Sequence, residues 1–163
     1  MPLPRFLLPA MLLLACAAAP ARAGTQELRL GLARLIETLD AGLTRADLRT
    51  LRIEIGAEIR VQKLYGMNTL ADIDDVAKAL TAADQVWTIL LGLPACQPAP
   101  AGGTAPAGTV ADPAACTAQI TPQLQVLGLT PPEAGTPINQ AGVIQPVLQA
   151  LRRQAERVLR NLR

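Results

Sequence analysis

Leu51-Arg-Ile-Glu-Ile-Gly-Ala-Glu-Ile-Arg-Val61 is the stretch that decides the fold, because it suits two different secondary structures. Apolar and polar residues alternate along it, apart from Gly56, and this period of two is typical of a β-strand. On a helical wheel, however, the region forms two opposed apolar stripes, which consist of Leu48, Leu51, Ile55 and Ile59 on one side and Ile53, Ala57, Val61 and Leu64 on the other.

Pairing favours the helix. No second alternating segment exists to complete a sheet, and a solitary strand cannot satisfy its backbone groups. The sequence Thr44-Arg-Ala-Asp47 also fits a capping box, which marks the start of a helix. We therefore predict a helix from Thr44 to Tyr65 that lies between two partners. The strand alternative would require pairing with another copy of the chain.

The neighbouring segments predict further helices. Residues 26–41 carry apolar side chains at steps of three and four, and Gly42 can end that helix in a left-handed cap. Thr69-Leu-Ala-Asp72 is a second capping box, in which Asp72, Asp74 and Asp75 suit the positive end of a helix dipole better than half a calcium site. A core stripe then runs down to Gly92 and consists of Ile73, Val76, Ala77, Leu80, Trp87, Leu90 and Leu91.

Asp84 is the one acidic residue that falls within this apolar stripe. A desolvated carboxylate there would have a raised pKa and could be functional. The alternatives are that it pairs with an arginine of a neighbouring helix or lies at the edge of the stripe, and we favour these structural interpretations.

The final helix is predicted from about Pro146 to Leu162, or from an earlier residue of the C-terminal amphipathic segment 139–163 if Pro146 only kinks it. Arg153, Arg157 and Arg160 project from the side opposite its apolar residues. They are candidates for binding an acidic partner or anionic lipid head groups. The simpler interpretation is that the apolar side packs on the first and third helices while the arginines are solvated, and we favour it.

A break in composition separates this helix from the helical core at 24–92. Residues 93–115 are rich in Pro, Ala and Gly and predict a flexible loop, and 116–138 predict a short helix and a linker. Asp112 and Pro113 suit the start of that short helix. Cys96 and Cys116 bracket the loop, and in an exported chain we expect them to form a disulfide. The loop is either a binding tip or a tolerated insertion, and its composition favours the insertion.

Residues 1–23 predict a signal peptide. Arg5 precedes an apolar run, and Ala21-Arg-Ala23 is the small-x-small pattern of a signal peptidase site. The run is too short for a transmembrane span, which needs about 20 apolar residues. Leu13-Leu-Ala-Cys16 resembles the lipobox of bacterial lipoprotein precursors, which implies lipidation at Cys16 as the alternative, although Leu14 departs from that pattern. The expected location is the bacterial periplasm or the medium, and a membrane anchor applies only with lipidation.

Composition excludes more functions than it suggests. The chain has 15 Lys and Arg against 13 Asp and Glu, and loss of Arg5 and Arg22 leaves 13 of each. A neutral domain with two remaining aromatic residues, Tyr65 and Trp87, argues against nucleic acid. No histidine is present, and no catalytic, cofactor or metal motif is recognisable.

We therefore predict a mainly α-helical single domain at 24–163, a small bundle of about four helices with a disulfide-clipped loop. Its predicted function is a non-enzymatic interaction or accessory module of the cell envelope, whose partner is another envelope protein. A periplasmic carrier of a small apolar ligand, bound between helices near Trp87 and Tyr65, is the alternative, and an enzyme that uses carboxylates such as Asp84 ranks last. Assembly with further copies of the chain stays open.

Overall fold

The structure is a computed structural model that describes residues 8–64, 71–100 and 108–162, with side chains described from Thr25 onward. Within these ranges the chain forms five α-helices and one turn of 3₁₀ helix, and it has no strand. The helices are α1 (Leu8–Ala41), α2 (Arg45–Leu64), α3 (Ala71–Gly92), α4 (Pro113–Val126) and α5 (Gln140–Asn161), and η1 is the short turn Pro94–Cys96. The mainly helical prediction is confirmed.

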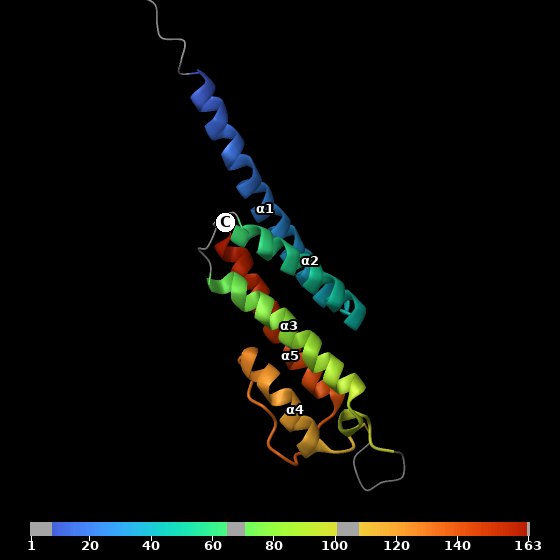
Figure 1. The fold of residues 1–163 in the computed structure, drawn as a ribbon. Coiled ribbons are helices and arrows are strands. Elements are labelled where there is room, and N and C mark those ends of the chain that lie inside the picture. The colour runs from blue at the N-terminus through green and yellow to red at the C-terminus, as the bar shows by residue number, and fades with distance from the viewer. Residues whose placement is uncertain (1–7, 65–70, 101–107, 163) are drawn as a thin grey trace, which may run out of the picture.

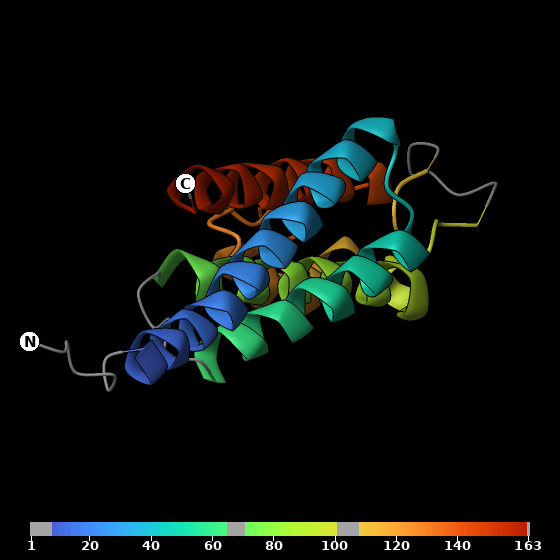
Figure 2. The same ribbon diagram turned by 90° about the horizontal axis from the view of Figure 1, so that it is seen from above.

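Four of the helices form a closed ring of neighbours. In this ring α1 contacts α2, α2 contacts α3, α3 contacts α5, and α5 returns to α1. The fifth helix, α4, packs on α3 and η1 from outside the ring (Figures 1 and 2). The count of about four helices was therefore too low by one, because residues 113–126 form a full helix that covers part of α3.

The ambiguous stretch 51–61 is helical and lies inside α2, so the helix prediction is confirmed. Its first apolar stripe is buried, but the prediction of a second buried stripe was wrong. Ile53 is 57% exposed and Leu64 is 84% exposed, because α1 and α3 flank α2 and no described element covers its outer side. Gln62, which is 3% exposed, is buried next to Thr25 of α1 instead.

Close packing between α1 and α2 explains why a glycine lies in the first helix. A Cβ added to Gly31 would lie only 3.2 Å from Cγ1 of Ile55, so the two helices approach closely there and a larger residue would require Ile55 to shift. Leu28, Leu32 and Leu35 of α1 are all fully buried in the core. The predicted interior face of this helix is therefore confirmed.

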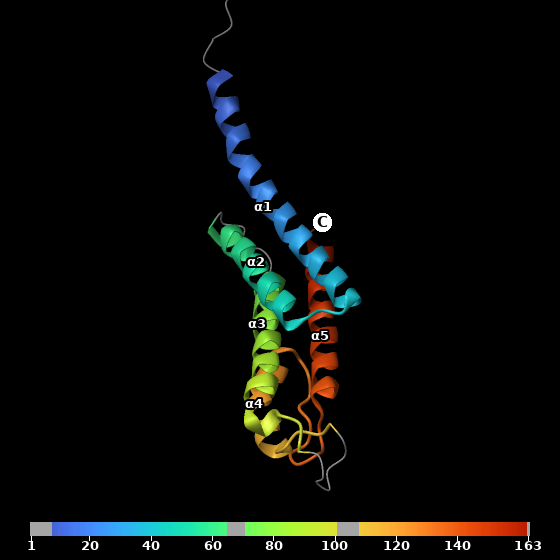
Figure 3. The same ribbon diagram turned by 90° about the vertical axis from the view of Figure 1, so that its right-hand side faces the viewer.

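The N-terminal half of α1 extends beyond the other helices (Figures 1 and 3). The helix was predicted to begin at Gln26 but begins at Leu8, because the apolar leader continues the same helix without a break. The structure thus gives one helix where the sequence predicted a leader followed by a helix.

Capping residues set the ends of the helices largely as predicted. The backbone N–H of Asp47 donates to Oγ1 of Thr44 at 3.2 Å, and the Thr44 backbone N–H donates to the Asp47 carboxylate at 3.0 Å. Hydrogen bonds from the Thr44 side chain and backbone lower the pKa of Asp47 below its usual value. Gly42 ends α1 at a φ of +100°, where a residue with a Cβ would be strained. The capping box at Thr69 lies outside the described residues.

The start of α5 matches the earlier of the two predicted starts. Asn139 caps the helix by accepting a 2.6 Å hydrogen bond from the backbone N–H of Gly142, and the helix continues through Pro146. The helix begins six residues before Pro146, as in the alternative in which this proline removes one backbone donor without stopping the helix.

Candidate functional site

The arginines of α5 form the first candidate site. Arg153, Arg157 and Arg160 are all exposed, and each lies one helical turn from the next along the outer side of α5. None of them has an ion-pair partner among the residues that the structure describes. We call these three residues the arginine stripe. Its opposite side packs on α3 and α1, as the sequence predicted.

Five of the nine other Lys and Arg residues whose side chains the structure describes form ion pairs. Arg34 pairs with Glu54 at 3.3 Å, and Lys63 pairs with Asp74 at 2.7 Å. Arg152, on the α1 side of α5, contacts Asp40 and pairs with Glu156 at 2.8 Å. The hydrogen bond that Arg152 donates to Glu156 and the charge of Asp40 raise the pKa of Arg152. The arginine stripe thus differs from its immediate neighbour in carrying charge that the described part of the fold leaves uncompensated.

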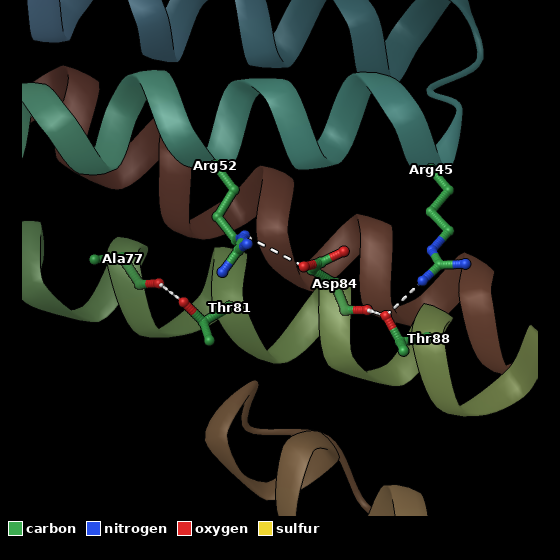
Figure 4. Close-up of polar contacts among 6 residues, drawn as sticks. All are labelled: Arg45, Arg52, Ala77, Thr81, Asp84 and Thr88. Atoms are coloured by element: carbon green, nitrogen blue, oxygen red, sulfur yellow. Dashed lines mark hydrogen bonds and ion pairs between the residues drawn. The ribbon is translucent and has the colours of Figure 1, made fainter. Parts of the chain in front are cut away.

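Asp84, the carboxylate singled out by sequence, faces α2. Its Oδ2 lies 3.2 Å from Nε of Arg52, and the Asp84 side chain is 14% exposed (Figure 4). One turn later the Thr88 hydroxyl accepts a 2.9 Å hydrogen bond from Arg45 of α2. The expected pairing with an arginine of a neighbouring helix is confirmed. Asp84 therefore belongs to a polar seam that joins α2 to α3, and this seam gives the carboxylate a structural role.

The acidic residues at the start of α3 are engaged separately. Asp72 accepts a 2.6 Å hydrogen bond from Nδ2 of Asn161, Asp74 pairs with Lys63, and Asp75 lies 3.3 Å from Lys78. Within the described ranges, no three Asp, Glu or Cys side chains gather in a way that could hold a metal ion. The interpretation of these acids as helix-start residues agrees with the position of Asp72 and Asp74 in the first turn.

The predicted disulfide is present between Cys96 and Cys116. Both residues are fully buried, and their Cα atoms are 5.1 Å apart, so the bond ties η1 to the first turn of α4. Nε2 of Gln140 donates to the carbonyl of Cys96 at 3.0 Å, which links the same point to α5. Asp112 caps α4 as expected, accepting from the Ala115 N–H at 3.0 Å.

The loop between these cysteines is anchored at its described ends. Val110 is 2% exposed, and its backbone N–H donates to the carbonyl of Ile138 at 2.9 Å. Ala99 pairs in the same way with the carbonyl of Thr109. The residues of the loop on both sides of 101–107 therefore pack onto the domain. Residues 101–107 themselves lie outside the described residues.

Sequence reasoning missed a surface trough that crosses α3. A hollow of about 430 Å³ lies between α2 and α3, and a second of about 500 Å³ continues along α3 toward the end of α4. They share four lining residues, which are Lys63, Asp74, Ala77 and Thr81. A third hollow, of about 190 Å³, joins Val126 to Arg157 of the arginine stripe. The exposed apolar residues Ile53 and Val126 border the trough, but only the packed fold brings them to one surface.

Two predicted features fall where the structure gives no side chain. Cys16 lies within α1, ahead of the residues whose side chains are described, and Tyr65 lies outside the described residues. No helix among residues 8–64, 71–100 and 108–162 is both long and apolar enough to cross a membrane.

The chain was compared with protein families, with curated proteins and with solved structures. No protein-family model, curated protein or solved structure matches this chain.

Proposed function

We propose that this chain is an exported, non-enzymatic accessory protein of the bacterial cell envelope that binds an acidic partner protein through α5. The observation that carries the proposal is the arginine stripe: three exposed arginines, one turn apart, with no ion-pair partner in the described structure. Exposed cations arranged in this way favour association with a surface of opposite charge, and they act mainly on the rate and specificity of association.

A protein surface fits the stripe better than a lipid surface. Membrane-binding helices place large aromatic residues beside their cations, whereas α5 contains no Trp, Tyr or Phe. Its apolar residues Val143, Val147, Leu151 and Val158 are also buried against the other helices. The helix therefore has charge to offer a partner, but no free apolar side to insert into a bilayer.

The apolar-carrier alternative has less support. The hollows that the described residues line carry charged side chains at their edges, including Lys63, Asp74 and Lys78. Such a lining suits the surface of another polypeptide more than a small apolar ligand.

Export is the second part of the proposal. The leader pattern at residues 1–23 supports it, and so does the way the corresponding part of α1 extends beyond the other helices (Figure 1). Cleavage after Ala23 leaves Leu28, the first buried core residue described, in the mature chain. In this proposal the disulfide forms after export, in an oxidising compartment. Lipidation at Cys16 is the alternative form of the same proposal.

Affinity capture after chemical crosslinking of intact producing cells tests this function. The wild-type chain should retain an envelope protein, and changing Arg153, Arg157 and Arg160 together to Glu should abolish its recovery. Arg153→Glu alone should weaken recovery, whereas the matched charge reversal Arg29→Glu, on the exposed side of α1, should not. Recovery should also fall as salt is raised, because exposed charges are screened. Equal recovery by wild type and the triple variant would refute the proposal.

A further inference from the structure

The outer side of α2 is an apolar surface that the described fold leaves uncovered. Ile53 is 57% exposed, Leu64 is 84% exposed, and Ala57 between them is half-buried. Ala57 follows Ile53 by four positions and Leu64 follows Ala57 by seven, which are about one and two helical turns, so all three residues lie on one side of the helix. A second buried stripe was expected there from the sequence, and its residues are present without the element that would cover them.

The trough beside this surface has a floor of small residues. Gly56 of α2 faces Ala77 and Thr81 of α3 across the hollow of about 430 Å³. A Cβ added to Gly56 would meet nothing nearer than Nη1 of Arg60, at 4.0 Å. The Thr81 hydroxyl already donates to the carbonyl of Ala77 at 3.0 Å (Figure 4). An apolar side chain can therefore enter the trough without depriving a polar group of its partner.

The charge along the trough is positive. Arg52 and Lys63 are paired with Asp84 and Asp74, respectively. Arg60 is exposed on the same wall and has no ion pair with any described residue. The wall can therefore accept a carboxylate from outside without displacing an existing ion pair.

A second copy of this chain does not fit that wall. Arg49 and Arg60 are eleven residues apart, which is three helical turns, so both lie on the same side of α2 as Ile53. Two copies packed symmetrically through this surface would bring arginines toward arginines, and like charges at an interface are unfavourable. The occupant must instead carry acidic groups.

The length of the trough points to a helix. The hollow between α2 and α3 continues along α3 through shared residues and reaches Val126, which is 51% exposed. Apolar residues at the two ends, a small-residue floor and a basic wall match the way an amphipathic helix lies in a groove. We propose that the α2–α3 trough binds an amphipathic helix of a partner protein, with its apolar side on Gly56 and Ala77 and its acidic residues beside Arg60.

The proposal depends on neither export nor the arginine stripe. Two synthetic probes of 18 residues test it: a Leu/Ala helix flanked by Glu, and its twin with Lys at every Glu position. Binding is followed by fluorescence anisotropy of each labelled peptide, with the whole chain isolated from producing cells. The acidic peptide should bind about tenfold more tightly than its lysine twin, because Arg60 attracts the Glu side chains of the first and repels the Lys side chains of the second.

Two variants with different chemistry locate the site. Gly56→Leu fills the trough without a change of charge, and Arg60→Glu reverses the charge of its wall. Each should weaken binding of the acidic peptide by about tenfold. Circular dichroism and thermal unfolding confirm that each variant is folded. Arg29→Glu, the same charge reversal on the exposed side of α1, should leave binding unchanged.

Three results would overturn the proposal. They are failure of the acidic peptide to bind, equal binding of both peptides, and binding that survives Gly56→Leu and Arg60→Glu. Weakening by Arg29→Glu to the same extent as by Arg60→Glu would also overturn it, because the peptide would then respond to the overall charge of the protein and not to the trough. Loss of the captured partner in the arginine-stripe experiment, by contrast, tests only the function proposed for α5.

Discussion

Replacing Cys96 and Cys116 together by alanine should lower the free energy of unfolding by about 3 kcal/mol. The disulfide joins residues 20 positions apart, and the loop-closure entropy that it removes from the unfolded chain is about 11 cal/mol/K, which corresponds to about 3 kcal/mol at 25 °C. Alanine is the better replacement because both sites are fully buried, where a serine hydroxyl would need a hydrogen-bond partner. The loss is large against the stability of about 5–15 kcal/mol that is typical of a domain.

Urea unfolding followed by circular dichroism and by fluorescence of Trp87, the single tryptophan, measures this loss. The wild-type chain with its disulfide reduced is the matched control. It keeps both sulfur atoms, so its difference from the double variant isolates packing from the crosslink. The reasoning would be refuted if the free energy of unfolding of the oxidised wild type exceeded that of the reduced wild type and that of the double alanine variant by less than about 1 kcal/mol. It would mean that the unfolded chain is already restricted near these residues.

Three further predictions concern single residues of the bundle. Asp84→Asn should destabilise the domain by about 1–2 kcal/mol in urea unfolding, because it leaves the half-buried Arg52 without its carboxylate partner. The control Asp75→Asn removes one partner of an exposed ion pair and should cost at most about 0.5 kcal/mol. Equal effects of the two variants would contradict the polar seam. Asp47 has a lowered pKa in the folded chain, so its contribution to stability is present above its unfolded pKa near 3.8 and is lost as the pH falls through the lower folded pKa. The free energy of unfolding of Asp47→Ala should therefore depend less on pH in that acid range than that of the wild type. An unchanged slope would contradict the capping box. Gly56→Ala should stabilise the domain by about 0.5–1 kcal/mol, because the added Cβ has space. Gly31→Ala should stabilise it less, because the added Cβ would lie 3.2 Å from Ile55. A larger gain in thermal stability from Gly31→Ala than from Gly56→Ala would contradict the packing of α1 on α2.

Local signals predicted much of this fold. The lack of a pairing partner for residues 51–61 correctly favoured a helix, and the capping residues Thr44, Asp47 and Asp112 marked helix starts that the structure confirms. Cys96 and Cys116 are joined as their positions on either side of the loop suggested. These features depend on neighbours in the sequence or on one covalent bond, so a single chain reveals them.

Features that depend on which helices meet were harder to predict. The wheel of α2 shows two apolar stripes of similar character, and nothing in the residues states that only the stripe with Leu48 and Ile55 finds a partner. Gln62 is buried because α1 packs against it, and a polar side chain gives no signal in the sequence that predicts such burial. The trough along α3 likewise forms only where α2 and α4 pack on α3. A pattern in one segment contains no information about that packing.

The claim that α5 is the binding surface is tested most directly by site-specific photocrosslinking in producing cells. A photoreactive residue at Gln149, one turn before Arg153 on the exposed side of α5, should give one discrete adduct with an acidic envelope protein. The adduct should disappear when Arg153, Arg157 and Arg160 are changed to Glu, and the same probe at Gln26 of α1 should not produce it. No adduct from position 149, or an adduct that persists in the triple variant, would contradict the role assigned to the arginine stripe.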